Sequence, residues 1–151
     1  MILLKMLLLP ISLMYGVIVW IRNKSFDWGL LKSQSFAVPI ISVGNISAGG
    51  TGKTPHVEYI IRLLYEQSGK AILSRGYGRK TKGFRWTDVN DTPDKVGDEP
   101  LQYAQKFLDV SVAVQEDRVK GVKNILKENK ELIILDDAFQ HRWVKPGLNI
   151  V

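Results

Sequence analysis

The chain has 151 residues, of which 45% are hydrophobic and 24% charged, with a formal net charge of +6 and no cysteine. This length allows one sizeable core, and the composition excludes a chain that is disordered throughout. The missing cysteines exclude disulfides and thiolate metal sites. The positive charge indicates an acidic partner, whether nucleotide phosphate, an anionic lipid surface or nucleic acid.

The first predicted element is the almost wholly apolar stretch of residues 6–21, which Pro10 interrupts. Such a run needs burial on every side, and it is slightly shorter than the roughly 20 apolar residues that span a bilayer. A membrane helix, either spanning or lying at the interface, is therefore favoured over a core helix of a soluble domain. A secretory signal peptide is disfavoured, because residues 22–36 lack a convincing cleavage site and are rich in Lys, Trp and Phe.

The next elements have the order of a phosphate-binding motif. Residues 38–43 are a short β-branched run ending at Gly44, which is typical of a buried strand. A glycine-rich loop follows, and apolar residues at helical spacing predict an amphipathic helix over residues 54–65. A second strand is predicted at residues 71–74, leading into a loop at residues 75–79 that no core explains.

Strands and helices also alternate in the rest of the chain. We expect a polar loop to residue 96, with a possible strand at 84–86, and then a helix over 99–107. A strand over 110–114 and a helix over 119–126, capped by Asp117, follow. The last expected elements are strands over 132–135 and 148–151. This alternation predicts an α/β fold of the P-loop NTPase kind, a mainly parallel sheet with helices on both faces. Ligands of such sheets bind at the carboxyl ends of the strands, where Gly44, Ser74 and Asp136 are expected.

The glycine-rich loop is the strongest single candidate for a binding site. Its residues are Ser47, Ala48, Gly49, Gly50, Thr51, Gly52, Lys53 and Thr54. The glycines let backbone N–H groups turn toward phosphate oxygens, and the following helix presents its positive end to the same anion. Lys53 would reach the β- and γ-phosphates, and the Thr54 hydroxyl would hold Mg²⁺. Ser47 departs from the usual glycine, and glycine-rich turns also occur without ligands, but a strand before and a helix after favour a nucleoside triphosphate.

Three further groups each have a structural and a functional interpretation. Asp136 and Asp137 after an apolar strand suit a second magnesium contact, or a cap or turn. Asp98 and Glu99 stand at a predicted helix start, where capping is the simpler reading, although Asp98 could also take the proton of an acceptor hydroxyl. Arg118 is either a solvated helix residue or a cation over the transferring phosphoryl group.

These motifs together resemble a known enzyme family. They occupy residues 43–45 with 47–55, 74–78, 97–100 and 136–141. In this order they resemble the tetraacyldisaccharide 4'-kinases, the lipid A 4'-kinase family, and the resemblance covers nearly the whole chain, including the amino-terminal apolar helix. Several motifs in a fixed order are far more specific than the glycine-rich loop alone.

The resemblance implies an ATP- and Mg²⁺-dependent kinase that phosphorylates the 4'-hydroxyl of a tetraacylated glucosamine disaccharide 1-phosphate to form lipid IVA. It implies a lipid substrate at a membrane surface, on the cytoplasmic face of the bacterial inner membrane; no nucleic-acid partner is expected and the oligomeric state is left open. By this resemblance, Lys53 and Thr54 bind the ATP phosphates and Mg²⁺, and Asp98 is the general base. Asp136 and Asp137 serve the metal and the reacting centre, and Arg118 stabilises the charge of the phosphate. The residues that contribute to the site and bind the acceptor are Arg75, Tyr77, Glu99, Gln140 and His141.

Two departures from the family and one competing function remain open. The family has glycine where this chain has Ala138, and its members are longer, with a second lobe and a histidine thought to assist the aspartate base. We therefore expect a membrane-associated segment over residues 1–36 and a truncated nucleotide-binding domain over residues 37–151, which binds ATP but turns over very weakly alone. The alternative is a membrane-associated ATPase or GTPase switch of the deviant P-loop type, which leaves Tyr77 and Asp98 unexplained and usually has another lysine early in the loop.

Overall fold

The structure of the protein, a computed structural model, describes residues 2–44, 53–138 and 140–151. The chain divides into two compact units, Met1–Ser33 and Gln34–Val151. The second unit begins slightly before residue 37, because Gln34 forms a parallel β-bridge with Val144 and Phe36 packs against the core.

The first unit consists mainly of helix α1 (Ile2–Asp27), which continues through Pro10. A proline inside a helix removes one backbone hydrogen bond, yet the helix is maintained on both sides of it. Large apolar side chains such as Leu13, Ile18 and Trp20 are more than half exposed. Within the part of the chain that the structure describes, no helix combines the length and apolar character needed to cross a bilayer.

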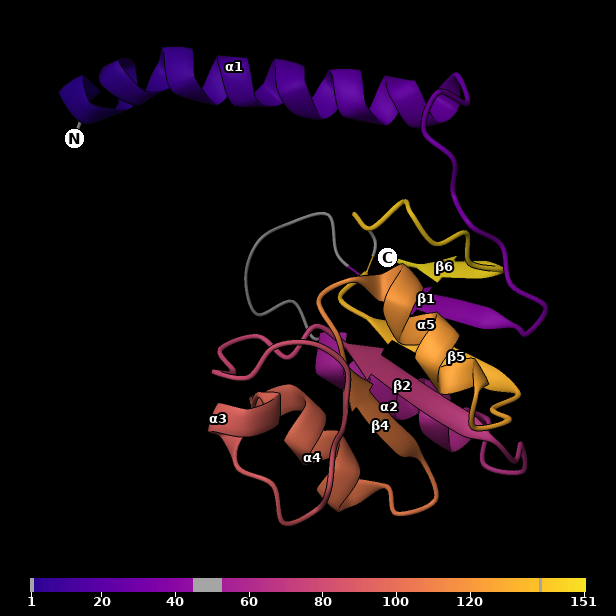
Figure 1. Cartoon of the computed structure of the whole chain (residues 1–151). Coiled ribbons are helices and arrows are strands. Elements are labelled where there is room, and N and C mark those ends of the chain that lie inside the picture. Colours follow the sequence, from indigo (N-terminus) through magenta and orange to yellow (C-terminus); the bar gives the residue numbers. More distant parts are fainter. Residues whose placement is uncertain (1, 45–52, 139) are drawn as a thin grey trace. The chain divides into compact units, whose positions relative to one another are not determined.

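The second unit is built on a six-stranded sheet in the order β3-β4-β2-β5-β1-β6 (Figure 1). The strands are β1 (Ile40–Val43), β2 (Lys70–Ser74), β3 (Arg85–Trp86), β4 (Ser111–Val114), β5 (Leu132–Asp136) and β6 (Leu148–Ile150). Neighbouring strands are parallel except β3, which pairs with β4 in the antiparallel direction. The predicted mainly parallel sheet is confirmed.

Helices cover both faces of this sheet (Figure 1). They are α2 (Lys53–Leu63), α3 (Pro93–Val96), α4 (Asp98–Lys106) and α5 (Arg118–Leu126). Successive strand residues point to opposite faces, so Ala71 and Leu73 of β2 join the cluster that contains Val122 of α5. Ile72 joins the cluster that contains Val57 of α2. Both faces are therefore buried, which explains why these strands are continuous apolar runs in the sequence.

Two local details differ in how well the sequence predicted them. Asp117 caps α5 as expected, since its carboxylate accepts a hydrogen bond from the Lys120 backbone N–H at 3.1 Å. Helix α3 was not predicted, because it lies in a polar segment and buries only Val96, too little to produce a helical pattern of apolar residues.

The register of the parallel strands brings their carboxyl ends to one edge of the sheet. Val43, which ends β1, pairs with Asp136, which ends β5. Ser74 at the end of β2 pairs with Val114 at the end of β4, and the residue before Ser74 pairs with Leu135. The candidate binding groups were predicted at this same edge.

Candidate functional site

The predicted phosphate-binding loop lies between β1 and α2, and most of it is outside the described residues. This applies to Ser47, Ala48, Gly49, Gly50, Thr51, Gly52 and the side chain of Lys53. The framework on either side is described: β1 ends at Val43 and α2 begins at Lys53. The loop therefore joins the carboxyl end of a strand to the amino end of a helix, whose first N–H groups have no partner within the helix.

Thr54, in the first turn of α2, faces the first turn of α4. Its Oγ1 lies 3.5 Å from Oε1 of Glu99, a long hydrogen bond. The Tyr103 hydroxyl is buried close to Thr54 and makes no hydrogen bond of good geometry among the described residues. Burial, together with the charges of Asp136 and Glu99, raises the pKa of this phenol, so it remains neutral at physiological pH.

Asp136 is the most buried acidic side chain at this edge, with 1% of its surface exposed. Burial, and the negative charges of Glu99 and Asp137, raise the pKa of its carboxyl to about 7, although Arg118 opposes the shift. One of its oxygens, Oδ2, is buried without a hydrogen-bond partner in the described chain. The next residue, Asp137, has a positive φ of 49°, so the chain turns sharply as β5 ends.

Arg118, the first residue of α5, is buried, since only 2% of its surface is exposed. Its guanidinium donates to the backbone carbonyl of Gln115 at 3.2 Å and to that of Asp136 at 2.6 Å. Burial lowers its pKa to about 10, which leaves it charged at neutral pH. The side chain thus joins the ends of β4 and β5. The interpretation as a solvated residue is wrong, and the phosphate contact stays a prediction.

The motifs around Tyr77 and Asp98 lie against each other although twenty residues separate them in sequence. Gly97 has a φ of 94°, and a Cβ at this position would approach the carbonyl oxygen of Tyr77 to 2.9 Å. Asp98 follows directly as the first residue of α4 and is exposed. Tyr77 is 88% exposed, and Arg75 is exposed as well. The turn that carries Tyr77 therefore contacts the residue before Asp98, and Arg75, Tyr77 and Asp98 are all exposed.

The segment after β5 is tied to the end of β1. The Ala138 N–H donates to the carbonyl of Val43 at 3.2 Å, and the His141 N–H donates to the carbonyl of Ala138 at 2.9 Å. Ala138 does not adopt a positive φ, so its backbone conformation does not require glycine. Gln140 is exposed and His141 is partly buried, in a short turn beside the end of β1.

The oxygens at this edge fit a magnesium ion. Mg²⁺ prefers oxygen ligands and usually keeps several from water and substrate phosphate. Thr54 and Glu99 supply such oxygens, and the unpartnered Oδ2 of Asp136 is a third. Among the described residues, no three acidic or histidine side chains form a metal site by themselves, so a cation here would depend on the nucleotide for part of its coordination.

The sequence did not single out Tyr103 or Arg79 as functional. Tyr103 lies one helical turn after Glu99, a spacing that places both on neighbouring positions of the same helix face. That spacing could have linked it to the Thr54 site, whereas nothing in the local sequence separates Arg79 from the other arginines of its loop.

The family profile described as Tetraacyldisaccharide-1-P 4'-kinase matches residues 4–151 of the chain. The chain belongs to this kinase family. The resemblance inferred from its motifs is thereby confirmed.

Named members of the kinase family are close in sequence. The tetraacyldisaccharide 4'-kinase of Phocaeicola vulgatus is 53% identical over 148 residues, covering 95% of this chain and 40% of the relative. That of Flavobacterium johnsoniae is 52% identical over 151 residues, covering 99% and 44%. A crystal structure of LpxK from Aquifex aeolicus in complex with ATP matches with a TM-score of 0.89 and 43% identity, over 97% of this chain and 48% of that one. The chain thus spans less than half the length of these relatives.

Proposed function

We propose that the chain is the nucleotide-binding part of a kinase that transfers the γ-phosphate of ATP to the 4'-hydroxyl of a tetraacyldisaccharide 1-phosphate, forming lipid IVA. The observation that carries the proposal is the meeting, at one sheet edge, of the phosphate-loop framework, Thr54, Asp136 and the turn from Gly97 to Asp98. All of these groups lie within residues 4–151, the part of the chain that the profile of this kinase family matches. The similar LpxK structure in complex with ATP supports ATP as the nucleotide.

On the nucleotide side, the loop before α2 would wrap its N–H groups round the phosphates of ATP, with Lys53 reaching the β- and γ-phosphates. Thr54, Asp136 and Asp137 are the groups that would hold Mg²⁺. Glu99, predicted from the sequence as an acceptor residue, would join them because its Oε1 lies 3.5 Å from the Thr54 hydroxyl. When bound, the ion neutralises charge on the phosphates. Arg118 would keep the end of β5 in place through the Asp136 carbonyl.

On the acceptor side, Asp98 would accept the proton of the 4'-hydroxyl. The hydroxyl oxygen then forms a bond to the γ-phosphorus while the bond from that phosphorus to the oxygen of ADP breaks. Arg75 and Tyr77, exposed beside Gly97, would bind the acceptor, with Gln140 and His141 completing the site from the end of β5. Correct placement of the acceptor oxygen supplies much of such a catalyst's rate.

A lipid acceptor requires the enzyme to work at a bilayer. Helix α1 exposes large apolar side chains, and Trp28, which follows it, is 66% exposed. Arg22, Lys24 and Lys32 add positive charge near the end of α1, which favours an anionic leaflet. We place α1 in the interface on the cytoplasmic face of the bacterial inner membrane, with no role for nucleic acid.

Phosphate transfer by the full-length gene product tests this function. With radiolabelled ATP, Mg²⁺ and tetraacyldisaccharide 1-phosphate, we expect label in the lipid and a loss of about 100-fold or more in kcat for Asp98→Ala, because the general base is removed. A matched control is Asp94→Ala on α3, whose exposed carboxylate pairs with Lys80, and it should keep near-normal activity. Hydrolysis of ATP without any transfer to lipid would instead support the nucleotide-switch function.

A further inference from the structure

Arg79 has an unusual environment for an arginine in a polar loop. Its side chain is 3% exposed. Nη2 donates to Oε1 of Glu116 at 2.6 Å and to the carbonyl of Gly83 at 2.8 Å. Nε and Nη1 are buried without partners among the described residues. Burying a guanidinium is costly unless a counter-charge lies close by, so the Glu116 contact is essential to this arrangement.

Glu116 connects Arg79 to the edge of the sheet. It lies between β4 and α5, one residue before the cap Asp117. Its second carboxylate oxygen accepts the Gly83 N–H at 3.2 Å, so both oxygens hold the same loop. Burial acts to raise the pKa of this carboxyl, but its own backbone N–H and Arg79 outweigh burial, and the pKa lies below the usual value. The carboxylate is thus ionised at neutral pH.

The aliphatic part of the Arg79 side chain packs against the 75–79 turn, which carries the predicted acceptor residues Arg75 and Tyr77. A Cβ on Gly76 would lie 2.6 Å from Cδ of Arg79 and 2.8 Å from the carbonyl oxygen of Val96. The aliphatic part of Arg79 therefore contacts Gly76. Backbone atoms of Gly76 in turn lie next to Gly97. Arg79 also closes the turn through its N–H, which donates to the Gly76 carbonyl at 3.3 Å.

We propose that Arg79 is a positioning residue for phosphoryl transfer, an inference that rests on the proposed function. Through Glu116 it anchors the 75–79 turn to the β4–α5 connection. Through Gly76 and Gly97 it fixes Tyr77 and Asp98 relative to each other. The guanidinium is buried away from the surface, so it acts through these residues and does not contact substrate.

Its effect should fall on the acceptor side of the reaction. The phosphate-binding loop follows β1, whereas the Arg79 turn follows β2, and β5 lies between these strands. Loss of Arg79 should thus misplace the base and the acceptor residues, while β1 and α2, which frame the phosphate-binding loop, stay in place. A misplacement of about 1 Å is enough to lower a rate by on the order of 100-fold.

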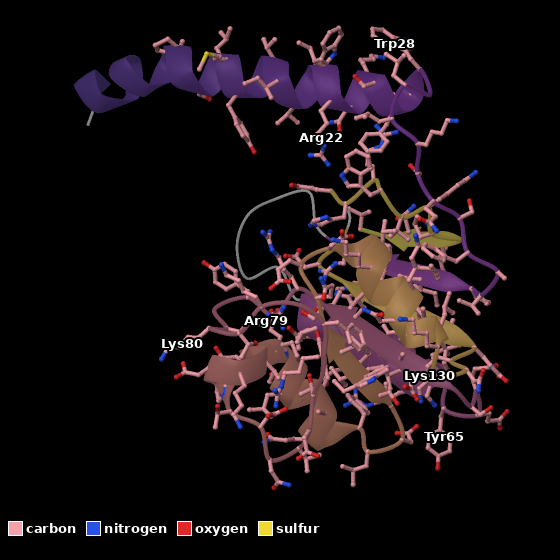
Figure 2. All side chains as sticks on the ribbon, viewed as in Figure 1. Arg22, Trp28, Tyr65, Arg79, Lys80 and Lys130 are labelled. Carbon is pink, nitrogen blue, oxygen red and sulfur yellow. The ribbon has the colours of Figure 1, made fainter. Side chains whose placement is uncertain are left out.

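The adjacent residue supplies a matched control. Figure 2 shows Arg79 within the body of the second unit and Lys80 extending outward from it. The Lys80 side chain is 77% exposed and pairs with Asp94 at 2.6 Å. Exposed pairs of this kind contribute little, so Lys80→Met removes the same charge without disturbing the turn.

The test compares steady-state kinetics of the full-length protein and its variants with the lipid disaccharide monophosphate and MgATP. We expect Arg79→Met to lower kcat by about 10- to 100-fold while KM for MgATP changes by less than about threefold. Arg79→Lys, which keeps the charge on a single donor nitrogen, should recover part of kcat, and Lys80→Met should match the unaltered protein.

A second variant and the affinity for MgATP distinguish the positioning role from a general loss of stability. Glu116→Gln keeps the size of the partner and should lower kcat in the same direction, and Arg79→Met and Glu116→Gln should be less than additive when combined. Equal loss of kcat and MgATP affinity, or no loss in either single variant, would overturn the positioning role. If the unaltered protein transfers no phosphate to lipid, the proposed function fails and this inference fails with it.

Discussion

Asp136 illustrates how the site is determined at the scale of single residues. Its carboxyl is buried at the end of β5, one oxygen lacks a partner among the described residues, and its pKa is raised to about 7 by burial and neighbouring carboxylates. A buried carboxyl of this kind is costly to ionise unless a cation or donor approaches it. The residue therefore fits a site that is completed by its ligand.

Asp136→Asn tests this through the pH dependence of stability. The folded-state pKa is raised, so between the ordinary carboxyl pKa and about 7 the native protein retains a proton that the unfolded chain has lost. The free energy of unfolding must fall as pH rises through this window. Without metal or nucleotide, the variant should gain on the order of 3 kcal/mol relative to the unaltered protein between about pH 4 and pH 8. Urea unfolding over this range measures it, and parallel curves for the two proteins would contradict the assignment.

Sequence patterns predicted residue roles only where the cause is local. Asp117 as a helix cap depends on its own neighbours and is confirmed. Arg118 depends on which strand ends lie near it, and its contact with the Asp136 carbonyl spans 18 positions in the chain. Arg79 and Glu116 are 37 positions apart. No local pattern specifies contacts of this kind.

At the scale of elements, the strands were readily predicted, whereas helix α3 and the contact between the 75–79 turn and Gly97 were not. Strands β2 and β5 are buried at every position, so their apolar runs are unambiguous. Helix α3 and the turn at Gly97 are held by contacts from residues 76 and 77, which no periodicity reveals. These junctions are the parts that place Asp98.

Alanine substitution tests whether backbone conformation and close approach together make glycine a stronger requirement at Gly97 than at Gly78. Gly97 and Gly78 both have positive φ, 94° and 78°, but a methyl group added at Gly97 would meet backbone atoms, while one added at Gly78 would face open space. Gly78→Ala should cost about 1 kcal/mol of unfolding free energy, from the conformation alone. Gly97→Ala should cost about 3 kcal/mol or more, because its φ of 94° and ψ of 159° are almost exclusive to glycine and a contact with the Tyr77 carbonyl is added. Equal losses in thermal or urea unfolding would argue against a stronger requirement for glycine at Gly97.

At the scale of the whole molecule, one sheet edge gathers motifs that are far apart in the sequence. The general rule for parallel sheets predicted that the ends of β1, β2 and β5 would meet, and the register confirms it. The order of the strands could not be predicted, because β1 lies between β5 and β6, and these pairings depend on the packing of the entire chain. The phosphate loop itself remains a prediction that its framework supports.

Binding of MgATP to the protein and to Lys53→Ala tests the central claim most directly. Calorimetric titration should show saturable binding by the unaltered protein and a loss of affinity of about 30-fold or more in Lys53→Ala, since the proposed lysine contact to the β- and γ-phosphates is removed. Lys120→Ala is the matched control, because this lysine is 73% exposed on α5 and should bind normally. No saturable binding by the folded protein, or equal affinity in Lys53→Ala, would contradict the account.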